Sequence, residues 1–268
     1  MELERIRKIL LKWLSGEDSK YLSARELFDG AINMARKSLK DDPYLIYDMI
    51  RLHGKRIQYD YLSDFLKHAG LEEFYDERTK KLKALEYPHL WINAYDDSFA
   101  PDEFRWFLDE VMHRGQSRDG QTTADLNFDV VLPWPWRGSR LTNCLKSIGE
   151  GKSAGAWQYD DLNHTLDYWE EIGIFFVHSG NHSIATGIMK STGSLPSRHK
   201  TDMSFMYKYI KSDGAYYYKK DGDSFKKLCD VVDPNFAIIY ELGRLAVEND
   251  LNYQEYKKMR LMQKCSKS

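Results

Sequence analysis

The sequence predicts an α+β fold, in which a helical first half precedes a half that mixes strands and helices. Apolar residues recur at helical spacing through residues 1–95. From Asn127 onward the apolar runs shorten to strand length, and glycines and prolines bound them. The polar segment Arg114–Thr123 is rich in turn formers and separates the two patterns. We therefore expect a helical domain over residues 1–125, with a mobile linker at its end, and a mixed domain over residues 126–268.

Composition narrows the class of protein. The 268 residues suffice for a sizeable core, and the 18 Tyr, 12 Phe and 7 Trp exclude a disordered chain. The 39 basic and 41 acidic side chains nearly cancel, so any charged binding surface is local. The three cysteines lack metal-ligand spacing, the N-terminus is unlike a signal peptide, and no apolar run approaches the roughly 20 residues of a membrane span. These features indicate a soluble cytoplasmic protein with no membrane contact.

Several helices of the first half carry recognisable start signals. Ser23–Glu26 is a capping-box pattern, and Asp42-Pro43 opens a further helix. Apolar periodicity predicts additional helices over residues 6–14, 59–69, 74–94 and 101–111. The basic cluster Arg51–Arg56 contains Gly54 and is interpreted as a solvated turn.

The second half is expected to alternate strands and helices, with a terminal helix. A strand over Phe128–Leu132 ends at Pro133, and the Asp213-Gly214 pair predicts a hairpin turn. Glu241 and Arg244 are spaced to pair on the terminal helix, and the lysine-rich end after Tyr256 is expected to be solvated. The expected elements are a helix over 140–148, strands over 164–168 and 172–177, the hairpin 203–210 with 215–219, and a helix over 236–247.

The most informative stretch is Phe175–Gly187. An apolar strand ends at His178, Gly180 permits a tight turn, and a helix begins that Asn181 or Ser183 can cap. Such a junction points backbone N–H groups and the positive end of a helix dipole at one spot. The stretch therefore predicts a site for phosphate or another anion. His182 in that turn is then a ligand contact or a proton carrier, or a structural histidine that bonds a backbone carbonyl.

The order of motifs from residue 130 to residue 188 resembles the ParB/sulfiredoxin-like superfamily. The matching pieces are Leu132-Pro133, Arg140-Leu141, Ser147-Ile148-Gly149 and Gly180–Ser183, the last in place of the family's Gly-x-His-Arg turn. The resemblance implies a ParB-like domain whose turn holds the phosphates of ATP or CTP, with Mg²⁺. It also implies NTP hydrolysis, phosphoryl transfer or phosphodiester cleavage, in bacterial or phage DNA-linked or defence biology.

Site residues follow from this resemblance position by position. Gly180 and the amides of Asn181 and Ser183 would cradle phosphate, His182 would contact or protonate a phosphate oxygen, and Arg140 or Arg137 would add a charged contact. Ser183 replaces the family's usual arginine, and Asn181 occupies the position of the sulfiredoxin cysteine, which excludes sulfinic acid repair. The departure at Ser183 leaves open a degenerate phosphate site in a non-catalytic nucleic-acid or protein-binding module.

Two further sets of residues are candidates. Glu150 is our first choice for the carboxylate that phosphoryl transfer needs. The alternative interpretation is that Glu150 is an ordinary surface charge. A metal-dependent nuclease using His178, His182 and His164 is a weaker alternative, because no third ligand lies close in sequence. His178 is expected to end its strand and point into the core or across the sheet.

The stretch Arg198–Lys227 interleaves aromatic and basic residues. Lys208, Lys219 and Tyr216 would bind nucleic acid if they lie on one exposed face, because lysines neutralise phosphates and rings stack on bases. An ordinary sheet with tyrosines inward and lysines outward is the favoured interpretation of the same pattern. The helical domain would recruit DNA or a protein partner, or form a homo-oligomer.

Overall fold

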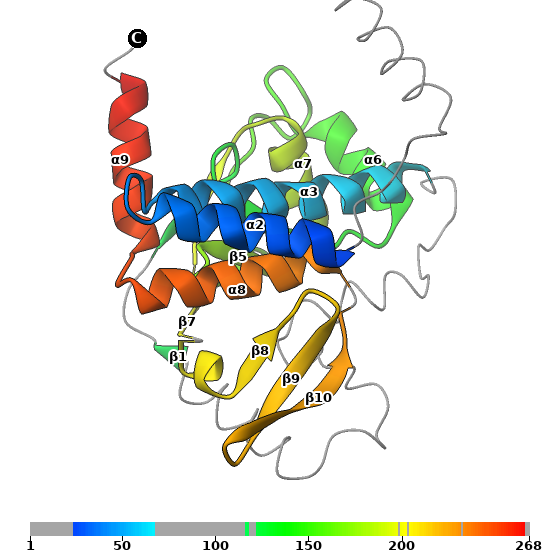
Figure 1. Cartoon of the computed structure of the whole chain (residues 1–268). Coiled ribbons are helices and arrows are strands. Elements are labelled where there is room, and N and C mark those ends of the chain that lie inside the picture. The colour runs from blue at the N-terminus through cyan, green and yellow to red at the C-terminus, as the bar shows by residue number, and fades with distance from the viewer. Residues whose placement is uncertain are drawn as a thin grey trace, which may run out of the picture.

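The computed structural model describes residues 24–67, 116–117, 122–197, 199–202, 204–231 and 233–265 (Figure 1). The helices expected over residues 6–14, 74–94 and 101–111 lie outside this part of the chain, as does most of Arg114–Thr123. The described fold mixes helices with three small sheets, which confirms the α+β class.

A layer of three helices is formed by α2 (Ala24–Ser38), α3 (Leu45–Lys67) and α8 (Pro234–Glu248). Each of the three contacts the other two, and Figure 1 shows them in front of the central sheet. Helix α2 begins inside the predicted capping box and buries Phe28, Ile32 and Ala35, which recur at helical spacing. Asp233 caps α8 by accepting the N–H of Asn235, and the predicted pair forms, with Arg244 Nε 2.7 Å from Glu241 Oε2.

The interpretation of Arg51–Arg56 as a solvated turn is wrong, because these residues lie in the middle of α3. Gly54 faces the central sheet there, and a Cβ at that position would lie 2.7 Å from a methyl carbon of Val130. Its missing side chain therefore allows α3 to approach the strand that contains Val130. Arg51 is used structurally, since its guanidinium donates to the carbonyl oxygen of Phe128 and the hydroxyl of Tyr256.

The central sheet has five strands in the order β1-β7-β4-β5-β3. β5 pairs parallel with β3 and antiparallel with β4, and its residues Ile174–Val177 are fully buried. β4 and β5 confirm the strands that the sequence predicts over residues 164–168 and 172–177, with Gly173 lying in the turn between them. The bounds are β1 Gln116–Ser117, β3 Val130–Leu132, β4 Thr165–Trp169, β5 Ile174–Ser179 and β7 His199–Thr201; β2 (Thr123–Asp125) pairs with β6 (Ser194–Pro196) separately.

A three-stranded antiparallel sheet follows, built from β8 (Ile210–Ser212), β9 (Tyr216–Asp221) and β10 (Ser224–Asp230). The predicted turn at Asp213-Gly214 is present, and a second turn at Asp221-Gly222 joins β9 to β10. The strand expected over residues 203–210 is wrong, because Ser204–Lys208 forms the 3₁₀ helix η2. Tyr207 is consequently buried while Tyr209 is exposed, so the two rings do not share a strand face.

The last helix, α9 (Tyr253–Cys265), corrects the expectation of a solvated lysine-rich end. Lys257 forms an ion pair with the fully buried carboxylate of Asp129. One continuous cluster of buried side chains runs from Phe28 in α2 to Tyr256 in α9, across the boundary expected near residue 125. No helix in the described part of the chain is long and apolar enough to cross a membrane.

Candidate functional site

Strand β5 passes through Gly180 into helix α7 (Asn181–Met189), as the sequence predicted. Gly180 has φ 81° and ψ 18°, the left-handed conformation that glycine adopts without a steric cost. The ring of His164 packs against it so closely that a Cβ on Gly180 would lie 2.3 Å from His164 Cδ2. Both the left-handed turn and the close packing of the His164 ring therefore require glycine at position 180.

The start of α7 has no side-chain cap, so its first N–H groups are available to a ligand. Asn181 and Ser183 do not fill the capping role that the sequence suggested. Ser183 Oγ instead donates to the carbonyl oxygen of Gly180 at 3.0 Å and lies 2.6 Å from His164 Nε2. The positive end of the α7 dipole is thus left without a compensating group from the described chain.

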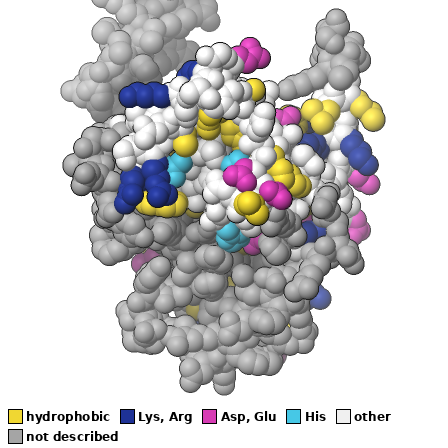
Figure 2. Space-filling model, turned by 180° about the vertical axis from the view of Figure 1, so that it is seen from behind, with side chains coloured by type: hydrophobic (Ala, Val, Ile, Leu, Met, Phe, Trp, Pro, Cys, Tyr) yellow, Lys and Arg dark blue, Asp and Glu magenta, His cyan; other side chains and the backbone are white. Residues whose placement is uncertain are grey.

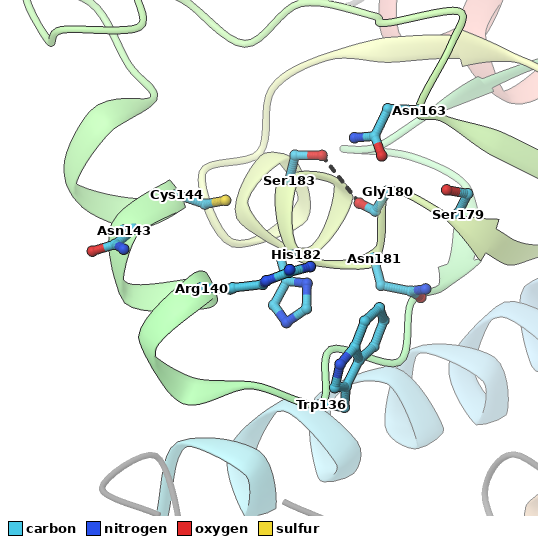
Figure 3. Close-up of a pocket in the computed structure, with 10 residues that line it drawn as sticks. All are labelled: Trp136, Arg140, Asn143, Cys144, Asn163, Ser179, Gly180, Asn181, His182 and Ser183. Carbon is cyan, nitrogen blue, oxygen red and sulfur yellow. Dashed lines mark hydrogen bonds between the residues drawn. The ribbon is translucent and has the colours of Figure 1, made fainter. Parts of the chain in front are cut away.

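A pocket of about 440 Å³ opens at this helix start (Figure 3). Helix α6 (Gly138–Ser147) supplies one wall through Arg140, Asn143 and Cys144, which share a helix face. The complete lining is Trp136, Arg140, Asn143, Cys144, Asn163, Ser179, Gly180, Asn181, His182 and Ser183. Seen from behind, histidine side chains border a hollow that has Lys and Arg side chains to its left and Asp and Glu side chains to its lower right (Figure 2).

His182 is held as a neutral hydrogen-bond donor. Its Nε2 accepts the backbone N–H of Arg137 at 3.2 Å, so the ring proton of the neutral form sits on Nδ1. Burial, assisted by the positive charge of Arg140, lowers the pKa of His182 to about 4. The side chain is 7% exposed, and Nδ1 has no partner among the described residues. An N–H donor with no partner in the described part of the chain is therefore left at the pocket wall.

Asn181 repeats this arrangement beside it. Its Oδ1 accepts the backbone N–H of Trp134 at 2.6 Å, which fixes the orientation of the amide. The side chain is 6% exposed, and its Nδ2 has no partner within the part of the chain described. Asn181 and His182 thus each accept a backbone N–H from the segment before α6, and each has a donor left at the pocket.

Arg140 brings the positive charge. Its side chain is exposed on α6, and it forms no ion pair with any described residue. Cys144 lies one turn further along, where burial raises the pKa of the thiol. The thiol is therefore protonated near neutral pH and is a poor nucleophile.

Ser183 and His164 do not form a nucleophile-base pair. The backbone N–H of Asp160 donates to His164 Nδ1 at 3.1 Å, so the proton of the neutral imidazole sits on Nε2. Nε2–H then donates to Ser183 Oγ and cannot accept its proton. Burial lowers the pKa of His164, which keeps the ring neutral, and Trp157 stacks on it at 5.2 Å between ring centroids.

His178 points across the sheet, as expected from its place at the end of β5. Its Nε2 lies 2.8 Å from Asp167 Oδ2 on the neighbouring strand β4. The described residues contain no group of three or more His, Cys, Asp or Glu side chains that could hold a metal ion. The arrangement therefore offers no support for a metal site at His178, His182 and His164.

The structure brings together five of the predicted site residues and leaves the others apart. The pocket lining includes Gly180, Asn181, His182, Ser183 and Arg140, whereas Arg137 lies outside the lining and donates its backbone N–H to His182. Other predicted residues are outside the lining: Glu150, exposed on the turn after α6; Lys208, exposed on η2; and Lys219 and Tyr216, on β9.

Several lining residues were missed by the sequence analysis. Asn143 and Cys144 follow Arg140 by three and four residues, and this helical spacing was a usable signal. Asn163 arrives from the loop before β4, and no local pattern connects that loop with α7.

Comparison with known proteins gives a family but no function. Residues 14–253 match DUF6710, a family of unknown function. No curated protein and no solved structure matches the chain.

Proposed function

The chain belongs to the DUF6710 family, and we propose from the geometry of its pocket that it binds the phosphate group of a nucleotide at the start of α7. The resemblance of Val130–Ile188 to the ParB/sulfiredoxin-like superfamily supports the same use of this turn. ATP and CTP are the nucleotides that this resemblance favours.

One observation carries the proposal: the polar groups left unpaired at the start of α7 are donors. The uncapped N–H groups of α7, the Nδ2 of Asn181 and the Nδ1–H of His182 all lack an acceptor among the described residues. Arg140 adds a full positive charge, and no carboxylate belongs to the lining. Donors without acceptors are what a phosphate group satisfies, since its oxygens are acceptors only.

The pocket also has room and groups for more than a phosphate. Its volume of about 440 Å³ falls within the range of small-molecule sites. Trp136 lies at the wall, with its ring 4.7 Å from that of His182, and offers an aromatic surface to a base. The amides of Asn143 and Asn163 can each donate and accept, as recognition of a base or sugar requires.

The geometry favours recognition of the nucleotide over its turnover. His182 uses its only lone pair on a backbone N–H, the Ser183 hydroxyl donates to a carbonyl, and the Cys144 thiol is protonated. None of these groups can take a proton from water in this arrangement. Phosphoryl transfer or phosphodiester cleavage stays a prediction, and it needs a carboxylate that the described lining lacks, with Glu150 lying outside it.

Arg140→Ala tests the proposal without disturbing the core. Isothermal titration with ATP, CTP and GTP and their diphosphates, with and without Mg²⁺, identifies the ligand. We expect Arg140→Ala to weaken its binding about tenfold or more, because a charge-assisted hydrogen bond is lost. Lys146→Ala is the matched control, since Lys146 is an exposed cation on the same helix outside the pocket.

The outcomes separate binding from catalysis. Equal affinity in Arg140→Ala and Lys146→Ala, or binding to none of the nucleotides, would overturn the proposal. Phosphate release by the wild-type protein would show turnover, and Glu150 would then be the first candidate for the catalytic carboxylate. The expected result is stable binding with intact nucleotide recovered after incubation.

A further inference from the structure

The three-stranded sheet has one face against the core and one face toward solvent. Cross-strand register places Ile210, Lys219 and Lys226 in one row of the first face, and Ser212 and Tyr217 in the next. Ile210 and Tyr217 are buried, and the Tyr217 ring meets that of Tyr240 in α8 at 6.0 Å. Because side chains alternate along a strand, the neighbouring residues point to the other side.

That other side, here called the outer face, combines rings with cations. Lys211, Tyr218 and Lys227 form one cross-strand row, and Lys220 with Phe225 forms the next. Tyr216 shares the face, since its ring lies 6.3 Å from that of Tyr218. Figure 1 shows this sheet below α8, at the other end of the molecule from α6 and α7.

The lysines of the outer face rest on its rings. Lys227 Nζ lies 3.6 Å from the centroid of the Tyr216 ring, and Lys211 Nζ lies 4.0 Å from that of Phe225. An exposed cation–π contact of this kind is weaker than the stacking of a base on an aromatic side chain. An arriving base can therefore replace the lysine on the ring, and the released ammonium can reach the adjacent phosphate.

The carboxylates near the outer face leave it cationic. Asp230 lies 2.9 Å from Lys227, and Asp213 accepts the hydroxyl of Tyr218 at 2.8 Å. Burial opposes ionisation of Asp213, but hydrogen bonds from Tyr216, Tyr218 and Ala215 and, least, the charge of Arg25 in α2 lower the pKa of its carboxyl below the usual value. Three lysines, Lys211, Lys220 and Lys227, thus share the outer face with these two carboxylates.

We propose that the outer face binds a single strand of nucleic acid, independently of the pocket. The lysines match the charge of the phosphates, and three rings on adjacent strands offer stacking surfaces to successive bases. An acidic peptide would satisfy the lysines but leave the rings unused, so the rings favour nucleic acid. Lys219 and Lys208 are not part of the surface, because Lys219 lies in a row of the other face and Lys208 lies on η2.

Fluorescence anisotropy with labelled oligo-dT and oligo-rU tests the proposal. We expect Lys211→Ala and Lys220→Ala each to reduce the salt dependence by about 0.7 in the slope of log affinity against log salt. Tyr216→Leu should weaken binding about tenfold, while Tyr216→Phe, which keeps the ring, should bind like wild type. Lys226→Ala is the control, because Lys226 is an exposed lysine of the same sheet, on β10, but belongs to a row of the opposite face.

Three results would overturn the proposal. The first is no binding of either strand, and the second is equal loss in Lys226→Ala and Lys220→Ala. The third is binding of poly-glutamate or duplex DNA as tight as that of the single strands, since neither offers free bases to the rings. Unchanged circular dichroism and melting temperature in each variant exclude misfolding as the cause of a loss.

Discussion

The contacts of His182 decide between the roles that its sequence position allows. A histidine at a helix start can carry protons, contact a ligand or bond the backbone. Here the Arg137 N–H occupies Nε2, and burial lowers the pKa of the ring to about 4. The side chain is therefore a fixed donor at neutral pH, which suits an acceptor-rich ligand and does not suit proton transfer.

This burial makes stability depend on pH. The unfolded histidine titrates near 6.5 and the folded one near 4, so the unfolded state binds the proton first as pH falls. Stability from this residue is present above about pH 6.5 and is lost progressively down to about pH 4. Between pH 7 and pH 5 we expect His182 to account for a loss of about 2 kcal/mol in the free energy of unfolding.

Urea denaturation of wild type and His182→Gln at the two pH values measures this loss. Glutamine keeps an acceptor for the Arg137 N–H but does not titrate, so the variant should lose about 2 kcal/mol less than wild type between pH 7 and pH 5. His164 and His53, whose pKa values are also lowered by burial, still titrate in both proteins. Identical pH dependence in the two proteins would contradict the buried, neutral state of His182.

At the scale of an element, the β5-Gly180-α7 junction depends on one glycine. We expect Gly180→Ala to destabilise the fold by about 2–5 kcal/mol, because it adds a left-handed alanine and a clash with the His164 ring. Gly222→Ala is the matched control: its φ is 58° but its Cβ would meet nothing within 4 Å, so only about 1–2 kcal/mol should be lost. Equal losses in urea denaturation would show that the His164 contact is unimportant.

Elements could be predicted where their signals are local. The turn at Gly180, helix α6 and the start of α2 near Ala24 are set by neighbouring residues, and the structure confirms these elements. Gly54 was interpreted as part of a turn because the reason for this glycine, the close approach of α3 to β3, involves residues far away in the sequence. The stretch 203–210 was misread because Tyr207 packs under Tyr240 of α8, and this burial outweighs the strand propensity of its residues.

The same limit applied to the site. The α7 half of the pocket follows from consecutive residues, so the sequence could place Gly180–Ser183 together. Arg140 joined them only through the resemblance, and Asn163 was missed because its loop reaches α7 through tertiary packing alone. Local patterns thus predicted the anion site at the start of α7, whereas the other walls of the pocket could be identified only from the three-dimensional structure.

At the scale of the whole molecule, α9 is held to the core by a buried ion pair. Asp129 is fully buried and accepts from Tyr253 Oη and from the Asp125 N–H, while Lys257 supplies the opposite charge. Lys257→Met should therefore cost about 3 kcal/mol in the free energy of unfolding, because it leaves a buried carboxylate without its cation. Lys258→Met, which removes an exposed cation from the next position of α9, should change stability by less than about 0.5 kcal/mol.

A double-mutant cycle shows whether the pair acts as one unit. If Asp129 and Lys257 stabilise the fold through each other, Asp129→Asn combined with Lys257→Met should cost about 1–3 kcal/mol less than the sum of the two single changes. Additive losses in urea denaturation would mean that each residue acts through other contacts. The pair joins positions 128 residues apart in the chain. Strong coupling would therefore also show that α9 folds together with the core that contains β3.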